Sequence, residues 1–67
     1  MRRMKLKARI VELYGTQDAF AEAIGVTRQT VTNTVRGHSV PQRHTWDKWA
    51  EALKVSRPDL VTIFFEL

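Results

Sequence analysis

The 67-residue chain contains no cysteine, so neither a disulfide nor a cysteine-ligated metal can stabilise its fold. It has no apolar run near the roughly 18 residues that a membrane span needs, which argues against a membrane protein. A chain this short buries only about 60% of its unfolded surface. We therefore expect one domain over residues 1–67, with no room for a separate catalytic domain. No catalytic motif is present, and an enzyme is not expected.

Acidic residues are absent between Glu22 and Asp47, although the net charge of the whole chain is only +4. Residues 1–37 carry seven Lys or Arg and three Asp or Glu, whereas residues 38–67 carry four of each kind. A face without carboxylates suits a polyanion such as nucleic acid. The alternative is an ordinary solvated basic surface.

Glycine is scarce, and all three glycines lie where a helical pattern ends. Apolar spacing predicts helices over about residues 5–14, 17–24, 28–36 and 45–53, and after Ser56, with a loop over 37–44. Thr16, Thr27 and Thr45 are the expected N-caps of the second, third and fourth helices. The expected inward residues of the first, fourth and fifth helices are Leu6, Ile10, Leu13, Tyr14, Trp46, Trp49, Ala50, Leu53, Leu60, Ile63, Phe64 and Leu67. The tail VTIFFEL is also rich in strand formers, so a C-terminal strand remains an alternative.

Residues 17–36 contain two short helical patterns separated by a glycine turn. Gly25 suits the left-handed conformation that ends a helix, and Thr27 can cap the helix that follows. That second helix carries polar side chains that can hydrogen-bond to base edges and phosphates. This arrangement is typical of a helix-turn-helix, which places its second helix in the major groove of DNA.

The sequence resembles the Cro/CI-type phage repressor helix-turn-helix family, also called Xre-like, over about residues 5–65. The residues that carry the resemblance are Gln17, Ala21, Gly25, Val26, Val31, Arg36, Gly37 and Pro41. Thr34 departs from the pattern, since the family usually has an apolar residue there. The resemblance implies an all-α, compact five-helix, lambda-repressor-like domain that binds duplex DNA. It also implies that Gln17 binds a phosphate and braces the recognition helix.

Within the expected helix-turn-helix, side-chain chemistry indicates which residues contact DNA. Arg28, Gln29, Thr32 and Asn33 are the expected base contacts, since Arg pairs with guanine and Gln or Asn with adenine. The expected DNA backbone contacts are Gln17, Thr27, Arg36, Ser39 and Arg43, together with Arg2, Arg3 and Lys5. Residues 1–4 are expected to form a flexible basic arm. The alternative for all of these is an exposed polar residue without a ligand.

Two other kinds of site are not expected. His38 and His44 lie in a loop without cysteine or nearby carboxylates, so they make a poor metal site. No cofactor is expected either. Trp46 and Trp49 could stack on single-stranded bases, but their helical spacing favours a place in the core.

Val61 and Phe65 fall on a second face of the last helical pattern. We interpret them as a dimer interface, with burial in the core as the alternative. The expected function is a transcription regulator, phage or prophage encoded, that occupies a pseudo-palindromic operator as a weak homodimer. The expected location is the bacterial cytoplasm, in association with the nucleoid. The alternatives are a protein-interaction module, such as an antirepressor or antitoxin, and a non-specific nucleoid protein.

Overall fold

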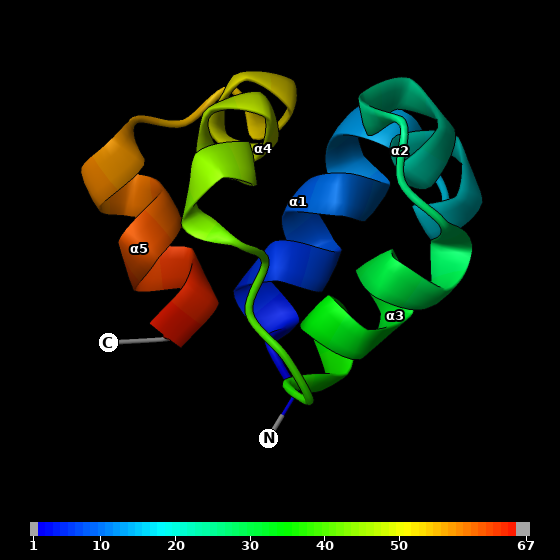
Figure 1. The fold of residues 1–67 in the computed structure, drawn as a ribbon. Coiled ribbons are helices and arrows are strands. Elements are labelled where there is room, and N and C mark those ends of the chain that lie inside the picture. The colour runs from blue at the N-terminus through cyan, green and yellow to red at the C-terminus, as the bar shows by residue number, and fades with distance from the viewer. Residues whose placement is uncertain (1, 66–67) are drawn as a thin grey trace.

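The computed structural model describes residues 2–65 as five short α-helices packed around one core (Figure 1). The helices are α1 (Met4–Tyr14), α2 (Gln17–Ile24), α3 (Arg28–Arg36), α4 (Trp46–Leu53) and α5 (Arg57–Phe65), with a 3-10 turn η1 (Arg43–Thr45) before α4. The all-α expectation is confirmed. The tail is helical as far as Phe65, so the strand alternative is wrong for that segment. Leu67 lies outside the described residues.

Aromatic side chains form the centre of the core. Phe20 of α2 contacts both Tyr14 and Trp49 edge-on, with ring centroids 5.2 Å apart in each pair. Phe64 of α5 contacts Trp49 at 5.7 Å and Trp46 at 5.6 Å in the same manner. Edge-to-face pairs are a favoured aromatic arrangement and add to the burial of apolar area. The prediction that both tryptophans are buried in the core is confirmed.

The N-caps of α2 and α3, and the glycine turn between these helices, are as the sequence predicts. The Thr16 hydroxyl accepts a hydrogen bond from the Ala19 N–H at 3.1 Å, and the Thr27 hydroxyl accepts one from the Thr30 N–H at 3.2 Å. Gly25 has φ +76° and ψ 32°, the left-handed conformation expected of it. The predicted caps and the glycine turn are confirmed. Each cap satisfies an N–H that has no partner within its own helix, so the glycine turn and the Thr27 cap fix where α3 begins.

The predicted cap at Thr45 is wrong. The Thr45 backbone is helical, and its hydroxyl donates to the Gln42 carbonyl at 2.7 Å instead of accepting from α4. The turn η1 leads directly into α4, so the chain has no extended residue that can act as a cap there. Leu13 also differs from expectation, because it stays partly exposed while Leu6 and Ile10 are fully buried.

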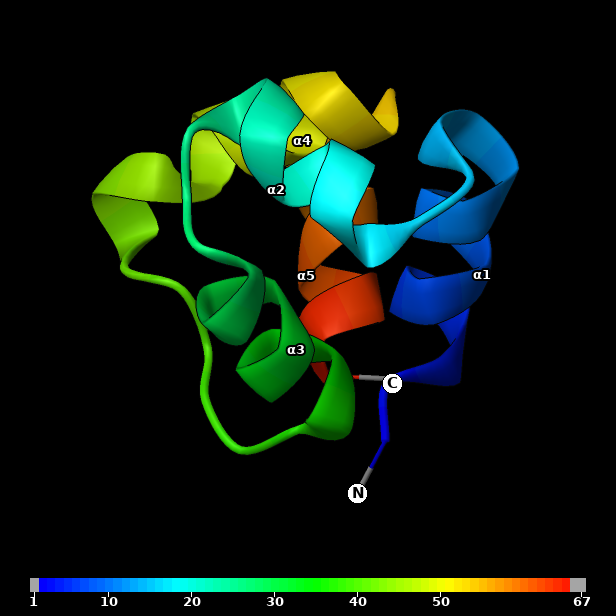
Figure 2. The same ribbon diagram turned by 90° about the vertical axis from the view of Figure 1, so that its right-hand side faces the viewer.

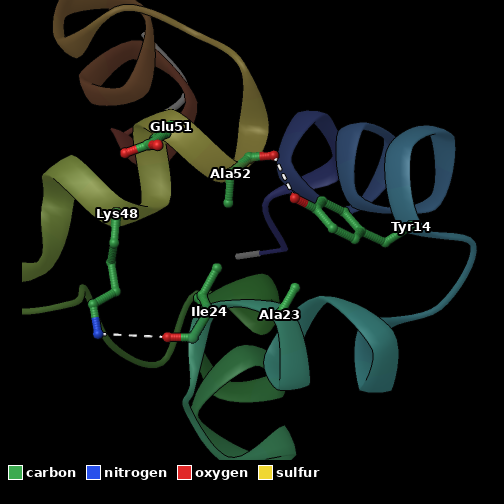
Figure 3. A pocket seen from close by; sticks show the side chains of 6 residues that line it. All are labelled: Tyr14, Ala23, Ile24, Lys48, Glu51 and Ala52. Atoms are coloured by element: carbon green, nitrogen blue, oxygen red, sulfur yellow. Dashed lines mark hydrogen bonds between the residues drawn. The ribbon is translucent and has the colours of Figure 1, made fainter.

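Two hydrogen bonds hold α4 against the first two helices (Figure 3). The Tyr14 hydroxyl donates to the Ala52 carbonyl at 2.8 Å, and the Lys48 ammonium donates to the Ile24 carbonyl at 3.4 Å. The Ile24 carbonyl belongs to the last turn of α2, where a cation is favourable. The open hollow between these groups has a volume of about 400 Å³. The bonds therefore fix the end of α2, and with it the turn that leads to α3.

Residues 3 and 4 do not belong to the flexible arm expected over residues 1–4. Met4 already belongs to α1, and Arg3 is 6% exposed. The Arg3 N–H donates to the Val35 carbonyl at 2.7 Å, and its side chain also bonds to backbone carbonyls of distant segments. The sequence shows a basic cluster at a chain end but not these long-range partners. The arm prediction is therefore wrong for Arg3 and Met4.

Candidate nucleic-acid interface

Helix α3 has one buried side and one open side. Val31, Thr34 and Val35 are buried, whereas Arg28 and Gln29 are exposed. Thr34 is only 1% exposed, and its hydroxyl donates to the Thr30 carbonyl at 2.8 Å, so a polar residue is accommodated at a position expected to be apolar. Figure 2 looks onto the side of the molecule formed by α2 and α3. The open side of α3 therefore carries polar side chains.

The side chains on this surface are linked to one another. The Gln29 amide nitrogen donates to the Asn33 side-chain oxygen at 2.9 Å, one helical turn further on. The Thr32 hydroxyl donates to the Gln17 side-chain oxygen at 3.4 Å, which connects α3 to the start of α2. A side chain with a fixed partner loses less conformational freedom when it binds a ligand. The structure thus joins four of the predicted site residues in two hydrogen-bonded pairs.

A carboxylate also lies on this surface, and the sequence interpretation did not include it. Asp18 Oδ1 lies 3.5 Å from Arg28 Nε, and both side chains are mostly exposed. The spacing between residues 18 and 28 gives no signal for this pair, because the turn at Gly25 sets how the two helices cross. Asp18 balances the charge of Arg28 in the free protein, although an exposed pair of this kind contributes little to stability.

The remaining candidate residues surround α3. Thr27 is exposed at its start, and Gln17 is partly buried at the start of α2. Arg36 and Ser39 are exposed at its far end, and the segment from Ser39 to Gln42 runs beside it across an open groove of about 330 Å³. These positions flank the polar side of α3 at both ends.

Arg43 is exposed but already has a partner. Its guanidinium carbon lies 5.6 Å from the centroid of the Trp46 ring, and that of Arg57 lies 5.8 Å from it. Stacking on an aromatic ring leaves the edge of a guanidinium free to donate hydrogen bonds. The sequence did not predict this arrangement, since it requires η1 and the start of α5 to meet at one ring.

The N-terminal cations divide into two groups. Arg2 and Lys5 are exposed. Arg3 is buried with its guanidinium on protein carbonyls, so its predicted contact with the DNA backbone is wrong. A phosphate cannot reach a guanidinium that is enclosed in this way.

Other kinds of site find little support in residues 2–65. Within that range no three His, Cys, Asp or Glu side chains lie together in a way that could hold a metal ion. The helices of the same range are too short or too polar to cross a membrane.

The glycine turn, the two threonine caps and the polar side of α3 define a helix-turn-helix domain, with α3 as its second helix. A family model described as helix-turn-helix matches residues 6–60, and the chain belongs to this Cro/CI-type (Xre-like) family of DNA-binding transcription regulators. Enzymatic activity is not general in the family. Comparisons with curated proteins and with solved structures gave no significant match.

Proposed function

We propose that the protein binds duplex DNA sequence-specifically through the exposed side of α3, inserted in the major groove. The observation that carries the proposal is the linked polar surface of α3, in which Asn33 holds the amide of Gln29 and Gln17 holds the hydroxyl of Thr32. Polar groups that are oriented before binding favour readout of base edges over loose attraction to phosphates.

Each base contact follows from the free groups of a side chain. Arg28 offers a planar fork that matches the O6 and N7 atoms of guanine. Gln29 keeps its carbonyl oxygen and its second N–H for the N6 and N7 atoms of adenine, because only one N–H is used by Asn33. Thr32 uses its hydroxyl on Gln17 and so presents its methyl group to a thymine methyl.

Backbone contacts would supply most of the affinity. We assign them to groups around α3 and at the N-terminus, namely Gln17, Thr27, Arg36, Ser39, Arg43, Arg2 and Lys5. Such contacts release counterions and carry no sequence information. The affinity should therefore fall steeply as the salt concentration rises.

Regulation would follow from occupancy of an operator, in the manner of a phage or prophage repressor in the bacterial cytoplasm. Two subunits would bind a pseudo-palindromic site with their α3 helices about 34 Å apart in successive major grooves. The dimer contact is assigned to α5, where Phe65 is 46% exposed. Val61 is partly buried against the core and so adds only its outer surface.

Selection from a randomised duplex pool tests the proposal. The full chain is bound to the pool, and the retained duplexes are sequenced. We expect a motif with two related half-sites and an affinity that falls linearly in a log–log plot against salt. Enrichment of no motif, with salt-sensitive binding to every duplex, would instead support a non-specific nucleoid protein.

The rival function is a protein-interaction module, such as an antirepressor or antitoxin. Exposed apolar side chains favour it, since Met4 is 58%, Val11 47% and Phe65 46% exposed. Apolar protein contacts depend only weakly on salt, whereas DNA binding through several phosphates depends on it strongly. Absence of DNA binding at low salt would favour this rival.

A further inference from the structure

Arg3 makes a set of bonds that the proposed DNA contacts do not use. Its side chain is buried, although the residue lies close to the chain end. One guanidinium nitrogen, Nη1, donates to the Thr34 carbonyl at 2.5 Å and to the Ser39 carbonyl at 2.7 Å. Nε donates to the Phe64 carbonyl, and the Arg3 backbone N–H donates to the Val35 carbonyl.

Three of these acceptor carbonyls lie at helix ends, and that of Ser39 lies in the loop after α3. Thr34 and Val35 lie in the last turn of α3, and Phe64 lies in the last turn of α5. Carbonyls in a last turn lack a partner within their own helix and carry the negative end of the helix dipole. The guanidinium therefore donates to backbone carbonyls of both helices and places a positive charge at the negative ends of their dipoles. The Thr34 carbonyl also accepts the Gly37 N–H at 3.2 Å, so Arg3 is its second donor.

Arginine is suited to this position because its donors are arranged in a rigid planar fork. A lysine ammonium has the same charge but cannot hold three carbonyls of three segments in a fixed geometry. Arg3 thus fixes the end of α3, the loop at Ser39 and the end of α5 relative to the start of α1. Both ribbon views place the N-terminal segment beside the end of α3 (Figures 1 and 2).

The need for such a fixed point arises from α3 itself. The helix is rich in Thr and Val, which are poor helix formers, so its geometry depends on its neighbours. Its start is held by the Thr27 cap, and its middle by the bond from Thr32 to Gln17. Its far end is held by Arg3, and that end leads into the loop that carries Ser39.

We infer that Arg3 is a positioning residue for DNA recognition, which sets the angle of α3 and the place of the Ser39 loop without touching DNA. The inference rests on the proposed function of α3. Because the same guanidinium holds α5, it also fixes the reading helix relative to the helix assigned to the dimer contact. Arg3 therefore governs base discrimination, whereas an exposed cation such as Arg2 adds affinity for any duplex.

The test compares Arg3→Met and Arg3→Lys with the matched control Arg2→Met. Affinities are measured for the duplex that the wild-type chain selects and for a scrambled duplex, at a temperature where circular dichroism shows each variant to be folded. Both Arg3 variants should lose about tenfold in affinity for the selected duplex, the size of one lost base contact, and less than about twofold for the scrambled duplex. Arg2→Met should weaken both duplexes alike and lower the salt slope by about one.

Three outcomes would overturn the inference. The first is a folded Arg3→Lys variant with the wild-type ratio of the two affinities, which would make the bonds purely structural. The second is a pair of Arg3 variants that behave like Arg2→Met, which would place Arg3 on the DNA. The third is an Arg3→Met variant that loses as much affinity for the scrambled duplex as for the selected one.

A loss of folding can be told apart from a loss of DNA discrimination. If Arg3→Met does not fold, Arg3→Lys decides, since it keeps the buried charge and a bond to one carbonyl. A wild-type chain that does not distinguish the two duplexes would contradict the proposed function itself, before any variant is measured.

Discussion

At the scale of single residues, Gly25 and Lys54 adopt the same left-handed conformation although only one of them is a glycine. Gly25 has φ +76° after α2, and Lys54 has φ +58° after α4. Glycine adopts this region without a steric penalty, whereas residues with a Cβ are strained there. A Cβ built at Gly25 meets no atom within 4 Å apart from those of its two chain neighbours, so any cost of substitution there is conformational.

These two positions give a matched pair of stability predictions. Gly25→Ala should lower the free energy of unfolding by about 1 kcal/mol, and Gly25→Val by at least as much, because neither residue favours a positive φ. Lys54→Gly should raise it by about 0.5–1 kcal/mol for the same reason. Urea unfolding measures both effects. A Gly25→Ala variant as stable as the wild type would show that this glycine is not needed for the turn.

Asp18 is the carboxylate beside Arg28, and its removal should change binding without changing the fold. Asp18→Asn should raise the affinity for every duplex several-fold, because a negative charge leaves the surface proposed to face the phosphates. The preference at the base read by Arg28 should weaken, since Arg28 is then free to turn to a phosphate. The free energy of unfolding should change by less than about 1 kcal/mol.

Asp59→Asn is the control for this prediction, because it makes the same charge change in the first turn of α5. Titrations on scrambled duplexes at one salt concentration compare the two variants. Equal gains in affinity would mean that Asp18 acts only through the total charge of the chain.

At the scale of elements, α3 consists largely of poor helix formers, so its stability depends on packing and on side-chain hydrogen bonds. Thr34 is buried, and its hydroxyl donates to a carbonyl within the same helix. Thr34→Val keeps the shape, and the Thr30 carbonyl keeps its helical N–H bond, so the free energy of unfolding should change by less than about 1 kcal/mol. Thr34→Ala should cost about 1–2 kcal/mol, because it also removes packed atoms. A larger loss in the Val variant than in the Ala variant would mean that the hydroxyl, not the packing, holds α3.

The sequence predicts those parts of the fold that depend on local signals. The helices α2 and α3 and their turn were predictable, because Thr16, Gly25 and Thr27 act on neighbours a few residues away. The role of Arg3 was not predictable, since its acceptors lie 31 to 61 residues further along the chain. The cap assigned to Thr45 failed because Gln42 provides a closer local partner for its hydroxyl.

The candidate site also contains features that the sequence predicts and features that it does not. Helical spacing predicted one surface for Arg28, Gln29, Thr32 and Asn33, and a hydrogen bond joins Gln29 to Asn33, one turn apart on the same helix. The ion pair of Arg28 with Asp18 and the stacking of Arg43 on Trp46 depend on how separate elements cross. Helical periodicity holds no information about such crossings.

At the scale of the whole molecule, the dimer assignment rests on the exposed end of α5. Phe65→Glu should leave the monomer folded, since Phe65 is 46% exposed. It should abolish any dimer and weaken binding to a full palindrome much more than to a half-site. Sedimentation equilibrium and titrations on the two duplexes measure these effects.

Val11→Glu is the matched control for the dimer prediction, since Val11 is equally exposed, at 47%, on α1. The control should leave both the association state and the palindrome affinity close to the wild type. A Phe65→Glu variant that still dimerises, or one that unfolds, would mean that the interface has to be sought elsewhere.

The exposed side of α3 is proposed to read base edges, and selection of duplexes by α3 variants tests this claim. The wild-type chain, Arg28→Ala, Gln29→Ala and a control outside α3, Arg57→Ala, are each bound to the same randomised duplex pool. The retained duplexes are then sequenced. Each α3 variant should lose about 1–3 kcal/mol at the wild-type motif and relax the preference at one base-pair position per half-site. Arg57→Ala should retain the wild-type motif. Selection of an unchanged motif with unchanged affinity by Arg28→Ala and Gln29→Ala would contradict the claim.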